Sequence, residues 1–144
     1  MDAYFDSAII VKLYVQEASS PEAVQLVADR TAPYVLTRWQ ALEVKNAIRL
    51  KAFRAEIALG EMLQSIAAFE QDIATGRWQR PVCPNAAVEA KAEELSEAFS
   101  AILGCRTLDI LHVAAALVVG AKEFVTFDAR QGALASRIGL RVKP

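Results

Sequence analysis

The chain alternates short apolar runs with longer segments in which apolar residues recur every three or four positions. The short runs are typical of strands, and they lie at residues 3–5, 33–36, 78–82, 123–127 and 140–142. The periodic segments predict helices, at residues 8–15, 21–30, 38–52, 55–75, 85–104 and 107–119, with a short helix after residue 128. Strands that alternate with helices in this way predict right-handed crossovers. We therefore expect an α/β fold with a central, mainly parallel sheet that helices cover on both faces.

Several helix boundaries are marked by residues that favour helix ends. Thr37 and Asn85 each precede a periodic segment and are expected to cap its first turn. Pro21 suits the first position of the second helix, and Gly76 suits the end of the fourth. No repeat, low-complexity tract or linker interrupts the pattern. We therefore expect residues 1–144 to form a single domain.

The segment from Arg106 to Ala116 is apolar on almost every side, which is typical of a buried helix. Asp109 lies inside it, and a buried carboxylate costs free energy unless a cation or hydrogen bonds compensate it. One interpretation is local. Thr107 would cap the helix, and Asp109 would interact favourably with the positive end of its dipole. The other interpretation is a functional site, and it gains weight because similar acids occur elsewhere in the chain.

Four acids stand among apolar neighbours: Asp6, Glu43, Asp109 and Asp128. Two of them follow predicted strands and two lie near the starts of predicted helices. In open parallel sheets, ligands bind at the carboxyl ends of the strands, so the placement of Asp6 and Asp128 indicates a site. Glu43 also has a local interpretation, because helix starts favour acids through the helix dipole. A carboxylate cluster suits Mg²⁺ or Mn²⁺, and two such ions about 4 Å apart can bind both reacting oxygens of a phosphodiester.

Composition narrows the class of protein without identifying a partner. Sixteen basic and seventeen acidic residues give a formal charge of −1, so no global basic field indicates nucleic acid. A local cationic site can still bind a polyanion. Cys83 and Cys105 form neither a zinc motif nor a disulfide framework, which favours a reducing compartment. The acidic start is no signal peptide, and the apolar stretch 113–121 is too short to span a bilayer. We therefore expect a soluble, cytoplasmic protein.

The segments that carry the four acids resemble, in order, the motifs of the PIN-domain family. More narrowly, they resemble the ribonuclease toxins of VapBC toxin–antitoxin pairs. The similarity lies in YFDSA at residues 4–8 with its continuation to residue 15, in Glu43, in RTLDILHVA at residues 106–114, and in FVTFDAR at residues 124–130. It spans almost the whole chain. Ala8 stands where many relatives carry a hydroxyl residue.

The resemblance implies a three-layer α/β/α fold and a Mg²⁺- or Mn²⁺-dependent RNA endonuclease. In that interpretation Asp6, Glu43, Asp109 and Asp128 hold the metal, and metal-activated water attacks the phosphodiester. Ser7 and Thr126 match positions where the family often carries a supporting hydroxyl. The family's partners would be RNA, a cognate antitoxin and a second copy in a homodimer, with no membrane involved.

The alternatives are a non-enzymatic binding module and a phosphoryl-transfer protein of another α/β type, either a phosphatase or a receiver domain. A catalytically inactive PIN-like binding module would keep the fold, but it would have no need of all four acids. A phosphatase of the haloacid-dehalogenase type would require an acid at position 8, which is alanine. A receiver domain would require further acids beside Asp6 and a lysine after a late strand. Neither pattern is present.

The remaining polar and aromatic residues have both local and functional interpretations. Arg106 precedes the Asp109 helix and suits either a substrate phosphate or a structural salt bridge. His112 lies three residues after Asp109, and we favour a core-packed histidine over a metal ligand. The basic residues of one helix, Arg38, Lys45 and Arg49, are interpreted as a solvated helix face. The two tryptophans, Trp39 and Trp78, are interpreted as packing residues. The helices at 8–15 and 21–30 are apolar on one side, which suits a partner's helix.

Overall fold

The computed structural model describes residues 2–144 and has the expected α/β class. Its elements are, in order, β1 (Ala3–Phe5), α1 (Ser7–Tyr14), α2 (Ser20–Ala28), β2 (Tyr34–Val35), α3 (Arg38–Phe53), α4 (Leu59–Ala74), β3 (Trp78–Gln79), α5 (Asn85–Leu95), the π-helical turn η1 (Ser96–Ser100), α6 (Ala101–Leu103), α7 (Thr107–Val118), β4 (Glu123–Val125), α8 (Ala129–Arg137) and β5 (Arg141–Lys143). All the strand pairs are parallel, as the alternation of strands and helices predicts.

The strands form two small sheets, whereas one sheet was expected. The first has the order β1-β4-β5, with Phe5 opposite Val125, and the second pairs β2 with β3. β2 lies beside β1 but does not join its ladder. The Phe5 carbonyl on the free edge of β1 instead accepts a hydrogen bond from Nε2 of Gln40 at 2.7 Å. A side chain of α3 thus takes the place of a neighbouring strand.

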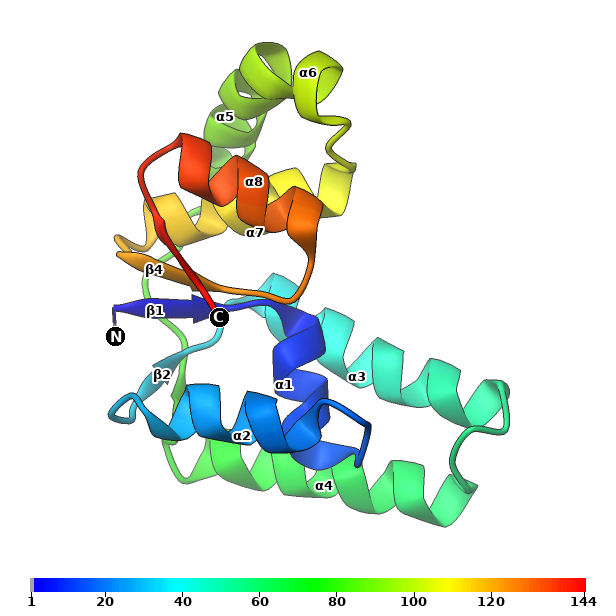
Figure 1. Cartoon of the computed structure of the whole chain (residues 1–144). Coiled ribbons are helices and arrows are strands. Elements are labelled where there is room, and N and C mark those ends of the chain that lie inside the picture. Colours follow the sequence, from blue (N-terminus) through cyan, green and yellow to red (C-terminus); the bar gives the residue numbers. More distant parts are fainter. Residues whose placement is uncertain (1) are drawn as a thin grey trace.

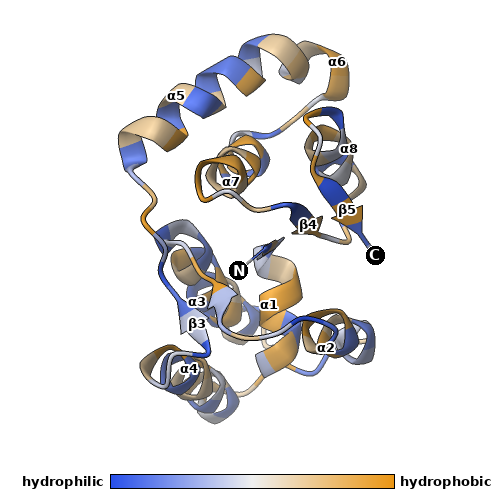
Figure 2. Ribbon diagram, turned by 90° about the vertical axis from the view of Figure 1, so that its left-hand side faces the viewer, coloured by the Kyte–Doolittle hydropathy of each residue, from blue (hydrophilic) through white to orange (hydrophobic). Residues whose placement is uncertain are grey.

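The core is divided between the two faces of β1. Successive side chains of a strand point to opposite faces, so Phe5 packs into one apolar cluster and Tyr4 into the other. Figure 1 shows α1, α2, α3 and α4 on one side of β1 and β4, and α5, α7 and α8 on the other. In Figure 2 the ribbons of α1 and α7 are largely orange, as expected for helices next to a sheet.

Local sequence signals explain some helix boundaries and miss others. Thr37 forms a complete capping box, because its hydroxyl accepts from Gln40 N and its amide donates to Gln40 Oε1 at 2.6 Å. α4 begins at Leu59 and not at residue 55, because Ala55 has a left-handed φ of 58°, which a right-handed helix cannot include. Asn85 is the first residue of α5 and makes no capping bond.

The apolar side of α1 is filled from within the chain. Ile9, Ile10 and Val11 are buried, and α1 packs against α2, α3 and α4 (Figure 1). The amphipathic pattern at residues 8–15 is therefore accounted for by the core of the protein itself. On α2, Val24 is the large apolar residue left half-exposed.

α7 is a strongly apolar helix on the side of β1 and β4 opposite α1, and seven of its residues are buried. Between residues 2 and 144, no helix combines the length and the apolar character that crossing a membrane would demand.

Candidate active site

Four chain segments bring the predicted acids to one cavity of about 480 Å³. The cavity is lined by acidic, basic and neutral side chains: Asp6, Ala8, Glu43, Arg106, Thr107, Leu108, Asp109, His112, Asp128 and Gln131. The acids come from the end of β1, from α3, from α7 and from the turn after β4. The cavity therefore lies at the carboxyl ends of two parallel strands, where the sequence predicts a site.

Asp6 and Asp128 are positioned by the backbone at these strand ends. The Asp6 amide donates to the Val125 carbonyl at 2.9 Å, so the β1–β4 ladder continues to the acid itself. Asp128 is the N-cap of α8, and its Oδ1 accepts from the amides of Arg130 and Gln131, each at 2.9 Å. Its other carboxylate oxygen contacts Arg106 in the cavity.

Asp109 is buried in the first turn of α7, and its compensating cation is Arg106. Thr107 is the first helical residue and not the cap, which corrects the local interpretation from the sequence. Arg106 Nε lies 3.1 Å from Asp109 Oδ2, and the same guanidinium lies 3.3 Å from Asp128 Oδ2. One arginine thus bridges two of the four acids, and so acts here as an internal counter-ion.

Glu43 is held by a buried chain of hydrogen bonds. His112 Nε2 lies 2.8 Å from Glu43 Oε2, and His112 Nδ1 lies 2.9 Å from the Tyr4 hydroxyl. The Tyr4 hydroxyl in turn lies 3.3 Å from Thr37 Oγ1. His112 is only 2 % exposed, so it is packed in the core as expected, but its ring also connects Glu43 to β1.

The hydroxyl groups of Thr126 and Ser7 lie beside the acids but differ in the hydrogen bonds that they make. Thr126 Oγ1 lies 3.3 Å from Asp6 Oδ2 and 2.9 Å from Gln131 Oε1, and it accepts from the Asp128 amide at 2.9 Å. It therefore ties two of the acids together. The buried Ser7 hydroxyl lies beside Glu43 but has no hydrogen-bond partner within residues 2–144.

Sequence reasoning missed three of the residues that organise this site. Tyr4 is hydrogen-bonded to His112 and Thr37, which are far away in sequence, whereas Gln131 accepts from Thr126, five residues before it. Tyr4 and Thr37 were noted only as a strand residue and a helix cap. The local sequence around Gln131 gives no sign of its contact with Thr126.

The two acids nearest His112 have their pKa values shifted in opposite directions. Burial raises the pKa of the Asp6 carboxyl, the charge of His112 opposes this, and the charge of Glu43 adds to it. Burial also acts to raise the pKa of the Glu43 carboxyl. There, the hydrogen bond and charge of His112 outweigh burial and lower that pKa below its usual range. Of these two acids, Asp6 is the one whose negative charge is less compensated.

The donor set has the chemistry of a hard-cation site, but its carboxylates are already engaged. Within residues 2–144, no three or more His, Cys, Asp or Glu side chains are grouped so that they could hold a metal ion. Arg106 lies between Asp109 and Asp128, and His112 occupies an oxygen of Glu43. Four carboxylates on one cavity nevertheless match the oxygen ligands of Mg²⁺ and Mn²⁺. The residue types therefore suit a divalent cation, although their side chains are not grouped around one point in this structure.

No protein-family model matches the chain, and the comparison with curated proteins likewise gives no match.

Proposed function

We propose that the chain is a Mg²⁺- or Mn²⁺-dependent RNA endonuclease with a three-layer PIN-like fold. The observation that carries the proposal is the convergence of four acids from four segments on one cavity: Asp6, Glu43, Asp109 and Asp128. Like charges so placed destabilise a folded protein unless a cation joins them. Helices on both sides of the β1-β4-β5 sheet are consistent with the three-layer arrangement.

A divalent cation held by these acids would supply the positive charge that activates water and offsets charge developing on the phosphate. The residues of the chain would do the rest. Thr126 orients the carboxylate of Asp6 and holds the backbone of Asp128. His112 fixes the carboxylate of Glu43. Arg106, whose side chain is 67 % exposed, is free to leave the acids and bind a phosphate oxygen.

The resemblance to VapBC toxins further suggests that the cytoplasmic partners are a cognate antitoxin and a second copy of the chain. An exposed apolar surface at the joined ends of α3 and α4 supports a dimer, with Phe53 at 88 %, Leu59 at 69 % and Leu63 at 63 % exposure. Light scattering at micromolar concentration tests this. We expect a dimer for the wild type and a monomer for Phe53→Ser combined with Leu59→Ser.

RNA cleavage by the purified protein, in Mg²⁺, in Mn²⁺ and in EDTA, tests the nuclease proposal directly. Cleavage is expected only with metal, and Asp109→Asn is expected to lose it while the circular dichroism of the fold is kept. Glu97→Gln removes an exposed acid from η1 and is the matched control. Wild-type cleavage by Asp109→Asn would contradict the proposed site. RNA binding without cleavage in any metal would instead favour the inactive binding module.

A further inference from the structure

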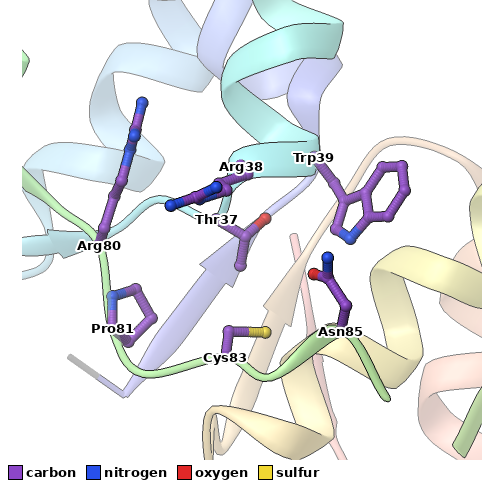
Figure 3. A pocket seen from close by; sticks show the side chains of 7 residues that line it. All are labelled: Thr37, Arg38, Trp39, Arg80, Pro81, Cys83 and Asn85. Carbon is purple, nitrogen blue, oxygen red and sulfur yellow. The ribbon is translucent and has the colours of Figure 1, made fainter. Parts of the chain in front are cut away.

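A second cavity, of about 370 Å³, lies where α3 begins and the chain leaves β3. It is lined by residues of these two segments: Thr37, Arg38, Trp39, Arg80, Pro81, Cys83 and Asn85. Figure 3 shows the Arg38 side chain extending toward the side of Arg80, and the Trp39 ring on the opposite side next to Asn85. Thr37 and Cys83 lie between the two sides.

The two arginines give this cavity an uncompensated positive charge. Both Arg38 and Arg80 are exposed. The ion pairs of residues 2–144 include neither of them, and no acid lines the cavity. Two guanidinium groups facing one space present forked donors that match the oxygens of a phosphate. The cavity is therefore suited to an anion.

Trp39 gives the cavity an aromatic surface as well. Its ring is partly exposed, whereas the ring of Trp78 is 1 % exposed and packs in the core. A solvent-accessible indole beside cationic groups is typical of sites that stack an unpaired nucleic-acid base. Asn85 is exposed beside the ring, and its amide can hydrogen-bond the edge of a base. This observation changes the expectation that Trp39 is only a packing residue.

The second cavity and the acidic site are both lined in part by α3. Trp39 and Glu43 are four residues apart on this helix, so they lie on the same side, about 6 Å apart along the axis. Thr37, in the wall of the second cavity, is joined to Glu43 through Tyr4 and His112. Trp39 and Glu43 therefore place the two cavities at successive turns of α3.

We propose that this cavity binds one unpaired nucleotide of single-stranded RNA next to the phosphodiester that is cleaved. The phosphate would lie between Arg38 and Arg80, and the base would stack on Trp39. A base inside a duplex is stacked on both faces and cannot reach the indole ring. The proposal rests on the proposed nuclease function for the choice of RNA, but not for the existence of the binding site.

The test is RNA binding by the whole chain in EDTA, where no cleavage occurs. A short labelled single-stranded RNA is titrated against the protein, and fluorescence anisotropy and tryptophan quenching are both recorded. Trp39→Ala is expected to weaken binding about tenfold or more, and Trp39→Phe to keep binding while removing the quenching. Arg80→Ala should flatten the dependence of log affinity on log salt by about 0.7, the loss of one single-strand phosphate contact.

Arg49→Ala is the matched control, because Arg49 is exposed on the same helix and lies outside both cavities. It should bind RNA as the wild type does. Equal weakening by Arg49→Ala and Arg38→Ala would show diffuse attraction and overturn the proposal, as would duplex RNA bound as tightly as the single strand.

The two proposals fail separately. Binding that depends on Arg38 and Trp39, without cleavage in any metal, supports the nucleotide site and contradicts the nuclease. Metal-dependent cleavage, with RNA binding unaffected by Arg38→Ala, Arg80→Ala and Trp39→Ala, contradicts the nucleotide site alone.

Discussion

Arg106 places one positive charge between two carboxylates that a divalent cation would also bind. Its side chain is largely exposed, and exposed ion pairs hold their partners weakly. The same residue can therefore neutralise the acids in the metal-free protein and give them up when metal arrives. From the sequence alone, Arg106 could be either a substrate contact or a structural salt bridge.

Arg106→Ala is expected to tighten Mg²⁺ binding, because the metal no longer competes with the guanidinium. The metal-free protein should melt at a lower temperature, since Asp109 and Asp128 lose their shared cation. The gain in melting temperature on adding Mg²⁺ should be larger than for the wild type. Melts in EDTA and in millimolar Mg²⁺ measure both effects, with Arg106→Lys as a control that keeps the charge. An unchanged Mg²⁺ gain would show that Arg106 does not compete.

Asp6→Asn is expected to raise the stability of the metal-free protein at neutral pH. The Asp6 carboxylate is buried and poorly compensated, and the amide keeps its shape and its acceptor oxygen toward Thr126. Asp109→Asn should bring no such gain, because it removes the partner of Arg106. Denaturant unfolding in EDTA compares the two. A less stable Asp6→Asn protein would mean that the acids do not strain the fold.

Tyr4→Phe is expected to lower the free energy of unfolding by about 1–3 kcal/mol, because His112 and Thr37 lose a buried partner. RNA cleavage should fall by about 10–100-fold, as for residues that orient metal ligands. Phe5→Leu on the other face of β1 is the control for packing alone. Normal cleavage by a destabilised Tyr4→Phe protein would make the hydrogen-bond chain purely structural.

At the scale of elements, the strand and helix boundaries that could be predicted from the sequence are those set by neighbouring residues. The strand that ends at Asp6, the capping box at Thr37 and the helix after Asp128 all depend on residues within a few positions of one another. The division of the strands into two sheets could not be predicted, because Gln40 of α3, far from β1 in sequence, occupies the edge of β1. Nor could the bridging of two acids by Arg106, since Asp128 is distant in sequence.

One ion-pair group joins α1, α3 and the segment before α2. Glu17 lies 2.8 Å from Lys12 Nζ and also pairs with Lys51. Partial burial acts to raise the pKa of the Glu17 carboxyl, but its hydrogen bonds to the two lysines lower it overall. A lowered pKa in the folded state contributes stability above the unfolded value, near pH 4.3, and that stability is lost as the pH falls through the folded value.

Glu17→Gln is therefore expected to be less stable than the wild type at pH 7, and the difference should shrink as the pH falls below about 4. Chemical unfolding across that range measures the difference. Glu22→Gln removes an exposed acid of α2 and serves as the control. A difference that does not change with pH would mean that Glu17 acts through packing and not through charge.

At the scale of the whole molecule, a formal charge of −1 means that the proposed RNA substrate would have to be attracted locally. The affinity for single-stranded RNA should therefore depend only weakly on salt. One or two phosphate contacts predict a slope of log affinity against log salt between about −0.7 and −1.4. Anisotropy titrations over a salt series measure it. A much steeper slope would indicate an extended basic surface in place of one nucleotide site.

The pairing of β1 with β4 also governs the order in which the protein can be assembled. Among residues 2–144, β1 is synthesised first, and its ladder partner β4 follows more than a hundred residues later. Asp6 therefore meets Asp109 and Asp128 only after the residues between them have been translated, and contacts so far apart in sequence form slowly. We expect a nascent chain to carry scattered acids but no assembled site. Under the proposed nuclease function, the messenger RNA and the ribosome would meet an assembled site only after Asp128 has been translated.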